Sequence, residues 1–446
     1  MGTTTLLQLD QKVLEATGDW LQVALTTAIG ASKLLVSTTL NNYDRGQNGI
    51  FDRYWVYIED YTNAGTSRWL GSTTYATSSG TAYVYGANLL SDSANKATVR
   101  ISRSSWANRK DAIARAIGEL YPLLYKSIDD RTLILGNALP NSHLEDETSG
   151  TPTHTSLTNV TAAAWTTAGE YRGPRGSKAI KLTATSSNGY MSWHSDDNPQ
   201  LLDLKDQTVT LKGWALPEMA NDGALVIYTK QADGTTQTLT SSTLNPASEY
   251  TQLSLEDQAL NDDLVEIEIR CKVATNTKYV IFDDIRLNDF PISDYRLPDA
   301  FDNGNIEKVE YQTIGYASDM CDDISLSATY TPLYGWEIID DGLYRYLRVP
   351  SAYRYLQERR LKITGTQPYE ALTAATHTVA TNSVGEISLI VAYAAYLLHE
   401  AGAGPVSADD TEKYDREMAK YYGKYQRLLM QHSKPTRSGT IQVAPL

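Results

Sequence analysis

A stretch of ten residues near the middle of the chain constrains the fold most. Its sequence is LVEIEIRCKV, over residues 264–273. Apolar and charged side chains alternate in it: one set is Val265, Ile267, Ile269, Cys271 and Val273, and the other is Glu266, Glu268, Arg270 and Lys272. Successive side chains of a strand point to opposite faces, so the two sets lie on opposite sides. The segment predicts a half-buried antiparallel strand.

Comparable short segments recur from residue 137 to residue 290. They are KAIKLTATS, YMSWHS, QTVTLKGWAL, ALVIYTK, EYTQLSLEDQ, LVEIEIRCKV and KYVIFDDIRL. About eight strands separated by turns, without a helical period, are typical of a two-sheet jelly roll. The same block holds 11 basic and 21 acidic residues, which is most of the chain's net charge of −14. Phosphate neutralisation needs a basic face, so this charge argues against sequence-specific nucleic-acid binding.

The length and composition bound the class of protein. A chain of 446 residues is too long for one ordinary core, and about two to four domains are expected. A hydrophobic content of 41% and a charged content of 21% are typical of a soluble globular protein. No run of about 18 apolar residues is present, so no membrane span is expected. The first residues lack a basic region and a continuous apolar run, which argues against a signal peptide.

The segments on either side of the block favour helices with smaller β regions. Helical periodicity and capping residues predict helices at about 5–17, 105–127, 384–401 and 408–431. Alternating segments between turns predict a β subdomain over about 33–102. Residues 1–136 and 291–446 are interpreted as one discontinuous domain, into which the jelly roll of residues 137–290 is inserted. The predicted class is α+β multidomain: a helical adaptor frame with small β subdomains, plus an inserted all-β jelly-roll sandwich.

The two ends of the block resemble the galactose-binding-like carbohydrate-binding modules. The resemblance lies in NALPNSHLED at Asn137–Asp146 and in YVIFDDIRL at Tyr279–Leu287, with LKGWAL as a middle strand. The chain departs from that pattern at Leu144, where those modules have an aromatic residue. The resemblance implies that the first and last strands are neighbours, which suits a domain inserted into a host loop.

That resemblance also implies a structural calcium ion where these two strands meet. Its expected ligands are Glu145, Asp283 and Asp284, with loop carbonyl groups completing the six to eight oxygens that a hard cation takes. The alternative is that the three carboxylates accept hydrogen bonds from backbone amides at a strand edge. No cofactor beyond this ion is expected.

Modules of this kind bind sugars with aromatic faces and polar side chains. The candidate aromatic residues are Trp193, Tyr190, Trp165 and Tyr228. Trp193, next to a loop in YMSWHSDD, is the preferred surface aromatic, whereas Trp214 within a central strand is expected in the core. A purely structural role of the module is the alternative to glycan binding.

The order of elements in the flanks resembles the head–tail adaptor proteins of tailed bacteriophages. It is carried by KDAIARAIGELYP, YRLP, LRVPS, LKITG and VGEISLIVAYAAYLLHEAG. The resemblance implies a homododecameric ring in the neck of a virion, assembled in the host cytoplasm, between the portal protein and a tail, nozzle or stopper protein. DNA would pass through the ring without sequence specificity. A C-terminal arm, residues 433–446, would bind a partner through Thr440, Ile441, Gln442 and Val443.

Residue patterns that carry chemistry are scarce. The six histidines are dispersed without an H-E-x-x-H motif, and no G-x-S-x-G elbow, Walker loop or G-x-G-x-x-G fingerprint is present. Cys271 and Cys321 are expected to remain thiols. No catalytic residue is predicted, and the protein is not expected to be an enzyme.

Three functions follow from the sequence, in order of preference. The first is a structural virion protein, a neck or head–tail adaptor ring subunit that joins portal to tail and lines the DNA channel, with a projecting jelly roll that binds surface glycans. The second is a receptor-binding or tail-fibre adhesion protein, in which the jelly roll is the main functional part. The third is a carbohydrate-active enzyme with an accessory module.

Overall fold

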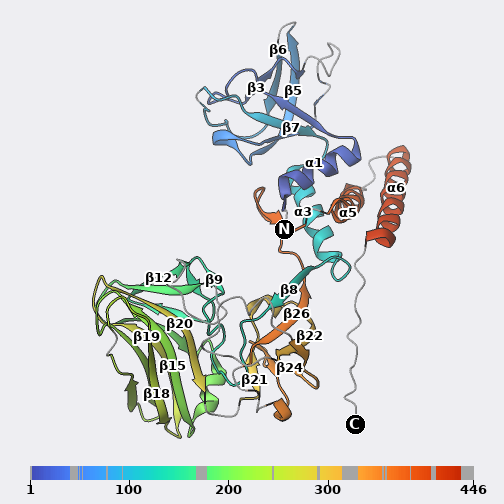
Figure 1. Cartoon of the computed structure of the whole chain (residues 1–446). Coiled ribbons are helices and arrows are strands. Elements are labelled where there is room, and N and C mark those ends of the chain that lie inside the picture. The colour runs from blue at the N-terminus through green and yellow to red at the C-terminus, as the bar shows by residue number, and fades with distance from the viewer. Residues whose placement is uncertain are drawn as a thin grey trace. The chain divides into compact units, whose positions relative to one another are not determined.

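The computed structural model divides the chain into two compact units (Figure 1). It describes residues 3–40, 49, 51–52, 54–76, 79–92, 94–166, 178–243, 246–288, 292–313, 330–353, 356, 359–381, 383–402 and 408–432. Unit 1 is Met1–Lys126 with Pro368–Thr436, and unit 2 is Ser127–Gln367 with Arg437–Leu446. The predicted jelly roll, residues 137–290, lies within unit 2, which also contains residues assigned above to the discontinuous flanking domain.

A β sandwich makes up most of unit 2. Its first sheet, here called the β19 sheet, has the order β11 (Ser156–Thr158), β14 (Gly189–His194), β19 (Leu264–Val273), β16 (Gly223–Gln231) and β17 (Thr236–Thr240). Its second sheet, the β20 sheet, has the order β12 (Val160–Trp165), β13 (Ala179–Ala184), β20 (Tyr279–Asn288), β15 (Thr208–Pro217) and β18 (Thr251–Ala259). Every neighbouring pair is antiparallel. The short strands β9 (Glu147–Thr148) and β10 (Thr151–Pro152) and the 3-10 helix η2 (Pro199–Leu204) complete it.

The alternation read in β19 sorts its side chains between the core and the outer face. Ile267, Ile269, Cys271 and Val273 are fully buried in the core between the two sheets. Val265, expected on the same face, is 52% exposed. The register between β16 and β19 shifts just there, since Lys230 faces Glu266 while Gln231 faces Leu264. The resulting irregularity leaves Val265 out of the core.

The two adjacent aspartates of β20 occupy a β-bulge. Asp284 has a left-handed backbone (φ 52°), and the pairing of β20 with β15 shifts at this point. An extra residue in one strand breaks the alternation, so Asp283 and Asp284 are both buried, at 0% and 3% exposure. The Asn137 side chain donates to Ile285 O and accepts from Leu287 N, which ties the start of the sandwich to β20. This first segment is a series of turns and not the expected strand.

A second, smaller core completes unit 2. One of its sheets has the order β23 (Tyr330–Pro332), β22 (Asn305–Gln312), β26 (Leu361–Gln367) and β8 (Lys126–Asp130). The other has the order β21 (Asp294–Arg296), β25 (Arg345–Arg348) and β24 (Glu337–Asp340), and the 3-10 helices η3 (Asp299–Phe301) and η4 (Ser351–Tyr353) lie between strands. Phe301, Leu347, Leu361 and Ile363 are fully buried in it. Because β8 and β26 are hydrogen-bonded neighbours, the chain enters and leaves unit 2 on adjacent strands.

The N-terminal β region of unit 1 is a six-stranded antiparallel sheet. Its order is β2 (Leu21–Ala24), β7 (Thr98–Ser102), β4 (Trp55–Ile58), β5 (Ser67–Ala76), β6 (Ser79–Val84) and β3 (Leu34–Ser37), with η1 (Tyr61–Asn63) after β4. Thr26 N donates to Val36 O, and the Ser37 hydroxyl donates to Ala24 O. These bonds join the two edges, so the sheet curves into a small barrel around its own core.

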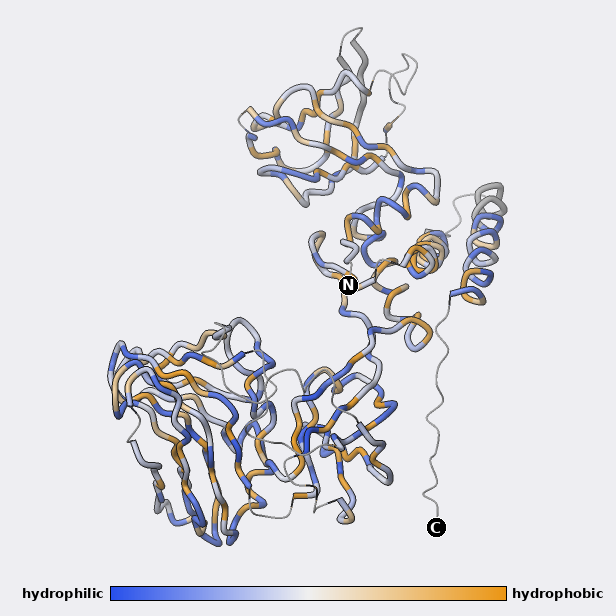
Figure 2. The backbone as a smooth tube through the Cα atoms, viewed as in Figure 1, coloured by the Kyte–Doolittle hydropathy of each residue, from blue (hydrophilic) through white to orange (hydrophobic). Residues whose placement is uncertain are grey.

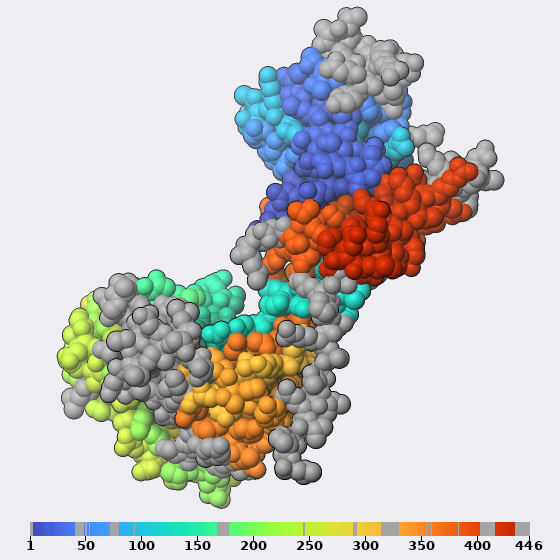
Figure 3. Space-filling model, turned by 45° about the vertical axis from the view of Figure 1, so that its right-hand side comes forward, coloured from blue at the N-terminus to red at the C-terminus, as the bar shows by residue number. Residues whose placement is uncertain are grey.

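Four helices form the rest of the described part of unit 1. They are α1 (Leu6–Thr17), α3 (Trp106–Glu119), α5 (Val384–Gly402) and α6 (Ala408–His432), and the strands β1 (Thr4–Thr5) and β27 (Thr378–Val379) pair beside them. Thr5 and Gln8 form a reciprocal capping box at the start of α1. The residues of α5 and α6 (orange to red in Figure 3) lie against the N-terminal residues in blue. Helix α3 ends at Glu119 and not near residue 127, because Pro122 cannot continue a helix.

Helix α5 is the apolar centre of these helices. Its tube is largely orange in Figure 2, whereas the coloured part of α6 is mainly blue. Over Val384–Ala401 it is long and apolar enough to cross a membrane by those two criteria alone. In the structure it packs against α1, α3 and α6, and Leu389, Ala392 and Ala394 are fully buried. These contacts are those of a core helix in a helical bundle.

The predicted fold class is wrong. Strands outnumber helices in the described residues, and the flanks contribute a barrel and a two-sheet core beside the helices. In the described residues the flanks do not form a helical frame with small β additions. Their short strands form hydrophobic cores of their own. The expected partner-binding residues Thr440, Ile441, Gln442 and Val443, the arm 433–446 and Cys321 lie outside the described residues.

Candidate functional site

The outer face of the β19 sheet carries a row of aromatic and charged side chains. Tyr190, Ser192 and His194 come from β14, and Glu266, Glu268, Arg270 and Lys272 come from β19. The register pairs Ser192 with Arg270 and His194 with Glu268, while on the other side Tyr228 of β16 pairs with Glu268. Paired residues of neighbouring strands present their side chains on the same face, so these groups lie together.

Arg270 lies between two tyrosine rings at the centre of this face. Its guanidinium carbon is 4.4 Å from the ring centre of Tyr190 and 4.1 Å from that of Tyr228. Both distances are those of a cation–π contact. The same guanidinium donates two hydrogen bonds to Glu268, of 2.8 and 2.9 Å. We call these four residues the tyrosine–arginine cluster.

The charges of Arg270 and Glu268 persist despite their burial. Burial disfavours both charged forms, yet the paired hydrogen bonds and the attraction between the two groups outweigh it. The pKa of Glu268 is therefore below its ordinary value, and the pKa of Arg270 is above its ordinary value. Glu268 remains a carboxylate and Arg270 a cation over the whole physiological pH range.

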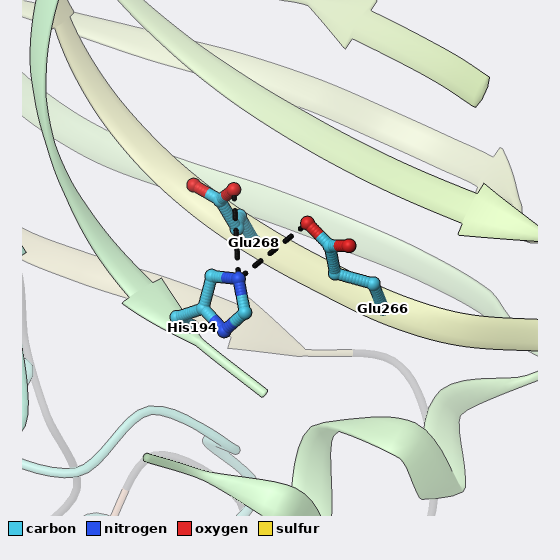
Figure 4. Close-up of side chains that lie close together, drawn as sticks. All are labelled: His194, Glu266 and Glu268. Carbon is cyan, nitrogen blue, oxygen red and sulfur yellow. Dashed lines mark ion pairs between the residues drawn. The ribbon is translucent and has the colours of Figure 1, made fainter. Parts of the chain in front are cut away.

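His194 extends this cluster towards the end of the sheet (Figure 4). Its Nε2 lies 3.5 Å from Glu266 and 3.7 Å from Glu268. The backbone N–H of Asp196 donates to Nδ1 at 3.0 Å, which assigns the proton of the neutral ring to Nε2, on the side of the two carboxylates. Lys230 lies 3.6 Å from Glu266, so two cations balance the two carboxylates.

His194, Glu266 and Glu268 form the group of potential metal ligands that the described residues contain. One ligand atom from each lies within 4.8 Å of the others. An imidazole and two carboxylates suit zinc or a similar divalent transition metal. A metal there would compete with Arg270 and Lys230 for the carboxylates. It would also need the lone pair of Nε2, whereas the hydrogen bond from Asp196 N–H keeps the ring proton on that atom. The arrangement as it stands is a self-neutralised ion-pair network.

The sequence candidates for glycan binding separate into three places. Tyr190 and Tyr228 are brought together around Arg270. Trp165 lies in the β20 sheet, where the Lys181 ammonium is 4.7 Å from its ring centre. Trp193 is fully buried, and its indole N–H donates to Pro140 O at 3.0 Å. The expectation that Trp193 is a surface aromatic is wrong, because its position in β14 alternates with Ser192 and His194 and points to the core.

Trp214 differs from its expectation in the opposite sense. It pairs with Asp283 and is half-buried, while Gly213 and Ala215 on either side face the core. A Cβ atom on Gly213 would meet Ile285 Cδ1 at 2.5 Å, so the Ile285 side chain occupies the space beside this glycine. The small residues of LKGWAL, and not its tryptophan, line the interior.

The expected calcium ligands each have another partner. Glu145 accepts from Lys178 N at 3.1 Å, and Asp283 accepts from Asp284 N at 2.7 Å. Asp284 forms a bidentate pair with Arg286, of 2.9 and 2.7 Å. The oxygen atoms of the three residues do not come within 4.8 Å of one another as a group. The structure thus supplies Asp284 with an internal cation, and calcium binding stays a prediction.

Sequence reasoning missed four residues of this site, namely His194, Glu266, Glu268 and Arg270. The signal was present, since Glu268 and Arg270 share the charged face of LVEIEIRCKV. The sequence does not show that β14, β19 and β16 are neighbouring strands. Their pairing brings together residues that are 38 or more positions apart, such as Tyr190 and Tyr228.

Comparisons with known proteins find only distant structural likenesses. No family model matches the sequence, and no curated protein matches it. One similar solved structure is the enzymatically active domain of bacteriophage CBA120 tailspike protein 4, with 11% identity and a TM-score of 0.26 over 34% of this chain and 21% of that one. A xylan-binding domain from CBM 22 has 12% identity and a TM-score of 0.27 over 31% of this chain and 89% of that one. TmCBM61, solved with β-1,4-galactotriose, has 13% identity and a TM-score of 0.25 over 34% and 99%. At these scores the likenesses carry no argument about function.

Proposed function

We propose that the protein is an adhesion protein that binds a saccharide on the outer face of the β19 sheet. The observation that carries this proposal is the tyrosine–arginine cluster. Its two rings offer flat apolar faces, and the charged pair between them offers donors and acceptors in a fixed plane. A sugar ring presents the matching pattern, with C–H groups on its faces and hydroxyl groups at its edge.

The surroundings of the cluster support a chain of several sugar units. Thr236, Thr238 and Thr240 of β17 are exposed at one edge of the sheet. Ser156 and Thr158 of β11 are partly exposed at the other edge. Polar hydroxyl groups therefore continue the face on both sides of the cluster. A face of this kind fits an extended saccharide better than a compact ligand.

Binding without hydrolysis agrees best with the state of the carboxylates. A glycosidase needs one carboxylic acid that keeps its proton near neutral pH, which requires a raised pKa. Glu268 has a lowered pKa and both of its oxygens accept from Arg270. Glu266 faces Lys230 and His194. We therefore propose a non-catalytic role for this face.

We prefer an adhesion function to the function of a head–tail adaptor. The described residues offer no support for a twelve-membered ring, a portal, a tail partner or a DNA channel. The adaptor interpretation depended on a helical frame that the structure replaces with several β cores. A place on a virion, where such a protein would attach to a cell surface, remains part of the proposal.

A glycan array probed with the full chain tests this function. We expect binding to at least one class of surface saccharide. Tyr228→Ala should weaken that binding by roughly tenfold, because an aromatic contact contributes about 0.5–1.5 kcal/mol beyond the buried area. Trp165→Ala on the β20 sheet is the matched control and should leave binding unchanged. An array without any bound saccharide, or a loss caused by Trp165→Ala alone, contradicts the proposed site.

A further inference from the structure

The charged side chains on the strands of the proposed glycan face do not cancel. Arg270 balances Glu268 and Lys230 balances Glu266. Lys272 lies two residues beyond Arg270, is partly exposed, and forms no ion pair with a carboxylate of the described residues. We propose that the saccharide of this face carries an anionic group, a carboxylate or a sulfate, which binds to Arg270 and Lys272 together. The inference rests on the proposed function and names the class of saccharide.

The positions around Lys272 supply no carboxylate. Its cross-strand partners are Tyr190 of β14 on one side and Ala224 of β16 on the other. Asp222, just before β16, is buried and accepts from Thr275 N at 2.7 Å. Among the described residues, Lys272 therefore has an aromatic neighbour and no internal counter-charge.

Arg270 offers a second donor beside Lys272. Its Nε and Nη2 both donate to Glu268, so this ion pair uses one edge of the guanidinium. Nη1 lies on another edge, and it has no hydrogen-bond partner in the described residues. It does not belong to the buried atoms that lack a partner, so it is in contact with solvent. Because Glu268 and two tyrosine rings already hold this guanidinium, it loses little conformational entropy when it binds an anion.

An acidic substituent on a sugar matches these two adjacent cations. Hydrogen bonds between ionised groups are roughly twice as strong as those between neutral groups. Tyr190 lies beside both cations: its ring centre is 4.4 Å from the guanidinium carbon of Arg270, and it is the cross-strand partner of Lys272. A sugar unit next to Tyr190 therefore presents its acidic group to both donors. A neutral sugar would leave the charge of Lys272 without a partner.

The two ends of the face differ in charge, which gives the saccharide a direction. At the other end, Glu266 lies beside His194, and the 88% exposed Asp196 is 3.5 Å from the same ring. These carboxylates repel an anionic group, so it binds at the Lys272 end. The acidic residues elsewhere in the sandwich act from greater distances, and salt screens such charges beyond about 8 Å at physiological ionic strength.

A glycan array that holds neutral glycans beside their sialylated, uronic-acid and sulfated forms tests the proposal with the full chain. We expect at least one anionic form to bind about tenfold more tightly than its neutral counterpart. The three kinds of acidic group show whether a carboxylate or a sulfate is preferred. Raising the salt from about 0.05 to about 0.5 M should weaken binding of the anionic form more than binding of the neutral one.

Variants of Lys272 assign this preference to the cation pair. Lys272→Met removes the charge and keeps an unbranched side chain, so it should weaken binding of the anionic form by about tenfold and leave binding of the neutral form unchanged. Lys272→Arg should preserve the preference, which excludes a loss through misfolding. Lys212→Met on the β20 sheet is the matched control, at a side chain that is 39% exposed, and should change neither.

Two results would overturn this inference alone. They are equal binding of a neutral glycan and its anionic form, and anionic binding that Lys272→Met leaves unchanged. In both cases Tyr228→Ala still reports whether the face binds a saccharide. An array on which neither neutral nor anionic glycans bind would overturn the proposed function, and this inference with it.

Discussion

The buried ring of His154 makes the stability of unit 2 depend on pH. The side chain is 3% exposed, and Nε2 lies 3.8 Å from Asp299. Burial, together with the charge of Arg296, lowers the pKa of His154 from 6.5 to about 4. The unfolded chain therefore binds a proton between these two pH values while the native chain does not. We expect the free energy of unfolding to fall by up to about 3 kcal/mol from pH 6.5 to pH 4.

Urea unfolding at several pH values measures this effect. His154→Asn is the matched variant, because asparagine tolerates the left-handed backbone of this position (φ 64°) and does not titrate. The free energy of unfolding of the wild type, relative to that of the variant, should fall as the pH falls from 6.5 to 4. Parallel pH profiles for the two proteins would show that His154 takes no part.

Trp193 should matter for stability and not for ligand binding. Replacing it with phenylalanine leaves Pro140 O without its donor inside the core, which costs about 1–3 kcal/mol. Trp165→Phe, at a half-buried position, should cost within about 0.5 kcal/mol. Chemical denaturation measures both. A larger loss for Trp165→Phe than for Trp193→Phe would contradict the assignment of Trp193 to the core.

At the scale of residues, the sequence predicts which side chains share a face but not which face is inside. Tyr190, Ser192 and His194 alternate with Met191 and Trp193, and both sets contain an aromatic residue. The buried Ile227 in the same sheet and the buried Leu211 in the opposite sheet show which face of β14 is inside. That relation appears only when the strands are paired.

The bulge in β20 places an internal cation beside Asp284. Arg286 is two residues beyond Asp284 and forms the bidentate pair that a cation would otherwise provide. We expect EDTA to leave the Tm of the full chain unchanged. Arg286→Met should destabilise unit 2 by about 3–5 kcal/mol, because a buried carboxylate loses its partner. A clear fall in Tm on EDTA treatment would contradict this expectation and support the calcium prediction.

A buried charge network joins the helices of unit 1 to its barrel. Asp10 of α1 accepts from Arg109 of α3 at 2.5 Å and from Arg100 of β7 at 3.0 Å, and all three side chains are buried. Arg100 also pairs with Glu59. Asp10→Asn should destabilise unit 1 by about 3–5 kcal/mol, since two buried guanidinium groups lose a counter-charge.

Asp111→Asn is the control for this network. Asp111 is 70% exposed and lies 4.0 Å from Lys110, so its loss should cost less than about 1 kcal/mol. Circular dichroism during urea titration compares the two variants. Equal losses in the free energy of unfolding would mean that the network stabilises unit 1 no more than an ordinary surface ion pair does.

At the scale of elements, the sequence predicts individual helices and strands better than it predicts which strands share a core. The capping box of α1 and the apolar stripe of α5 are local features that the sequence displays directly. Strands such as β21 and β24 contain three and four residues, and their stability comes from β25, which lies between them. Short segments of this kind carry too little periodicity to show that they share one core.

For the whole molecule, separate cores predict separate unfolding. The sandwich core contains Ile269, and the helical core of unit 1 contains Ile113. Truncating either to alanine should cost about 2–5 kcal/mol. Differential scanning calorimetry should show two transitions, of which Ile269→Ala lowers one and Ile113→Ala lowers the other. A single transition that both variants shift equally would show that the two units unfold as one.

The adjacent position of β8 and β26 has a consequence for the history of such proteins. A gene for unit 1 can gain, lose or exchange the coding segment for residues 127–367 through crossovers at two points whose products meet in space. If residues 127–367 were removed, a short turn would join the two cut ends of unit 1. Exchange of this segment would change the face proposed to bind a saccharide and leave the sequence of the rest of unit 1 unchanged.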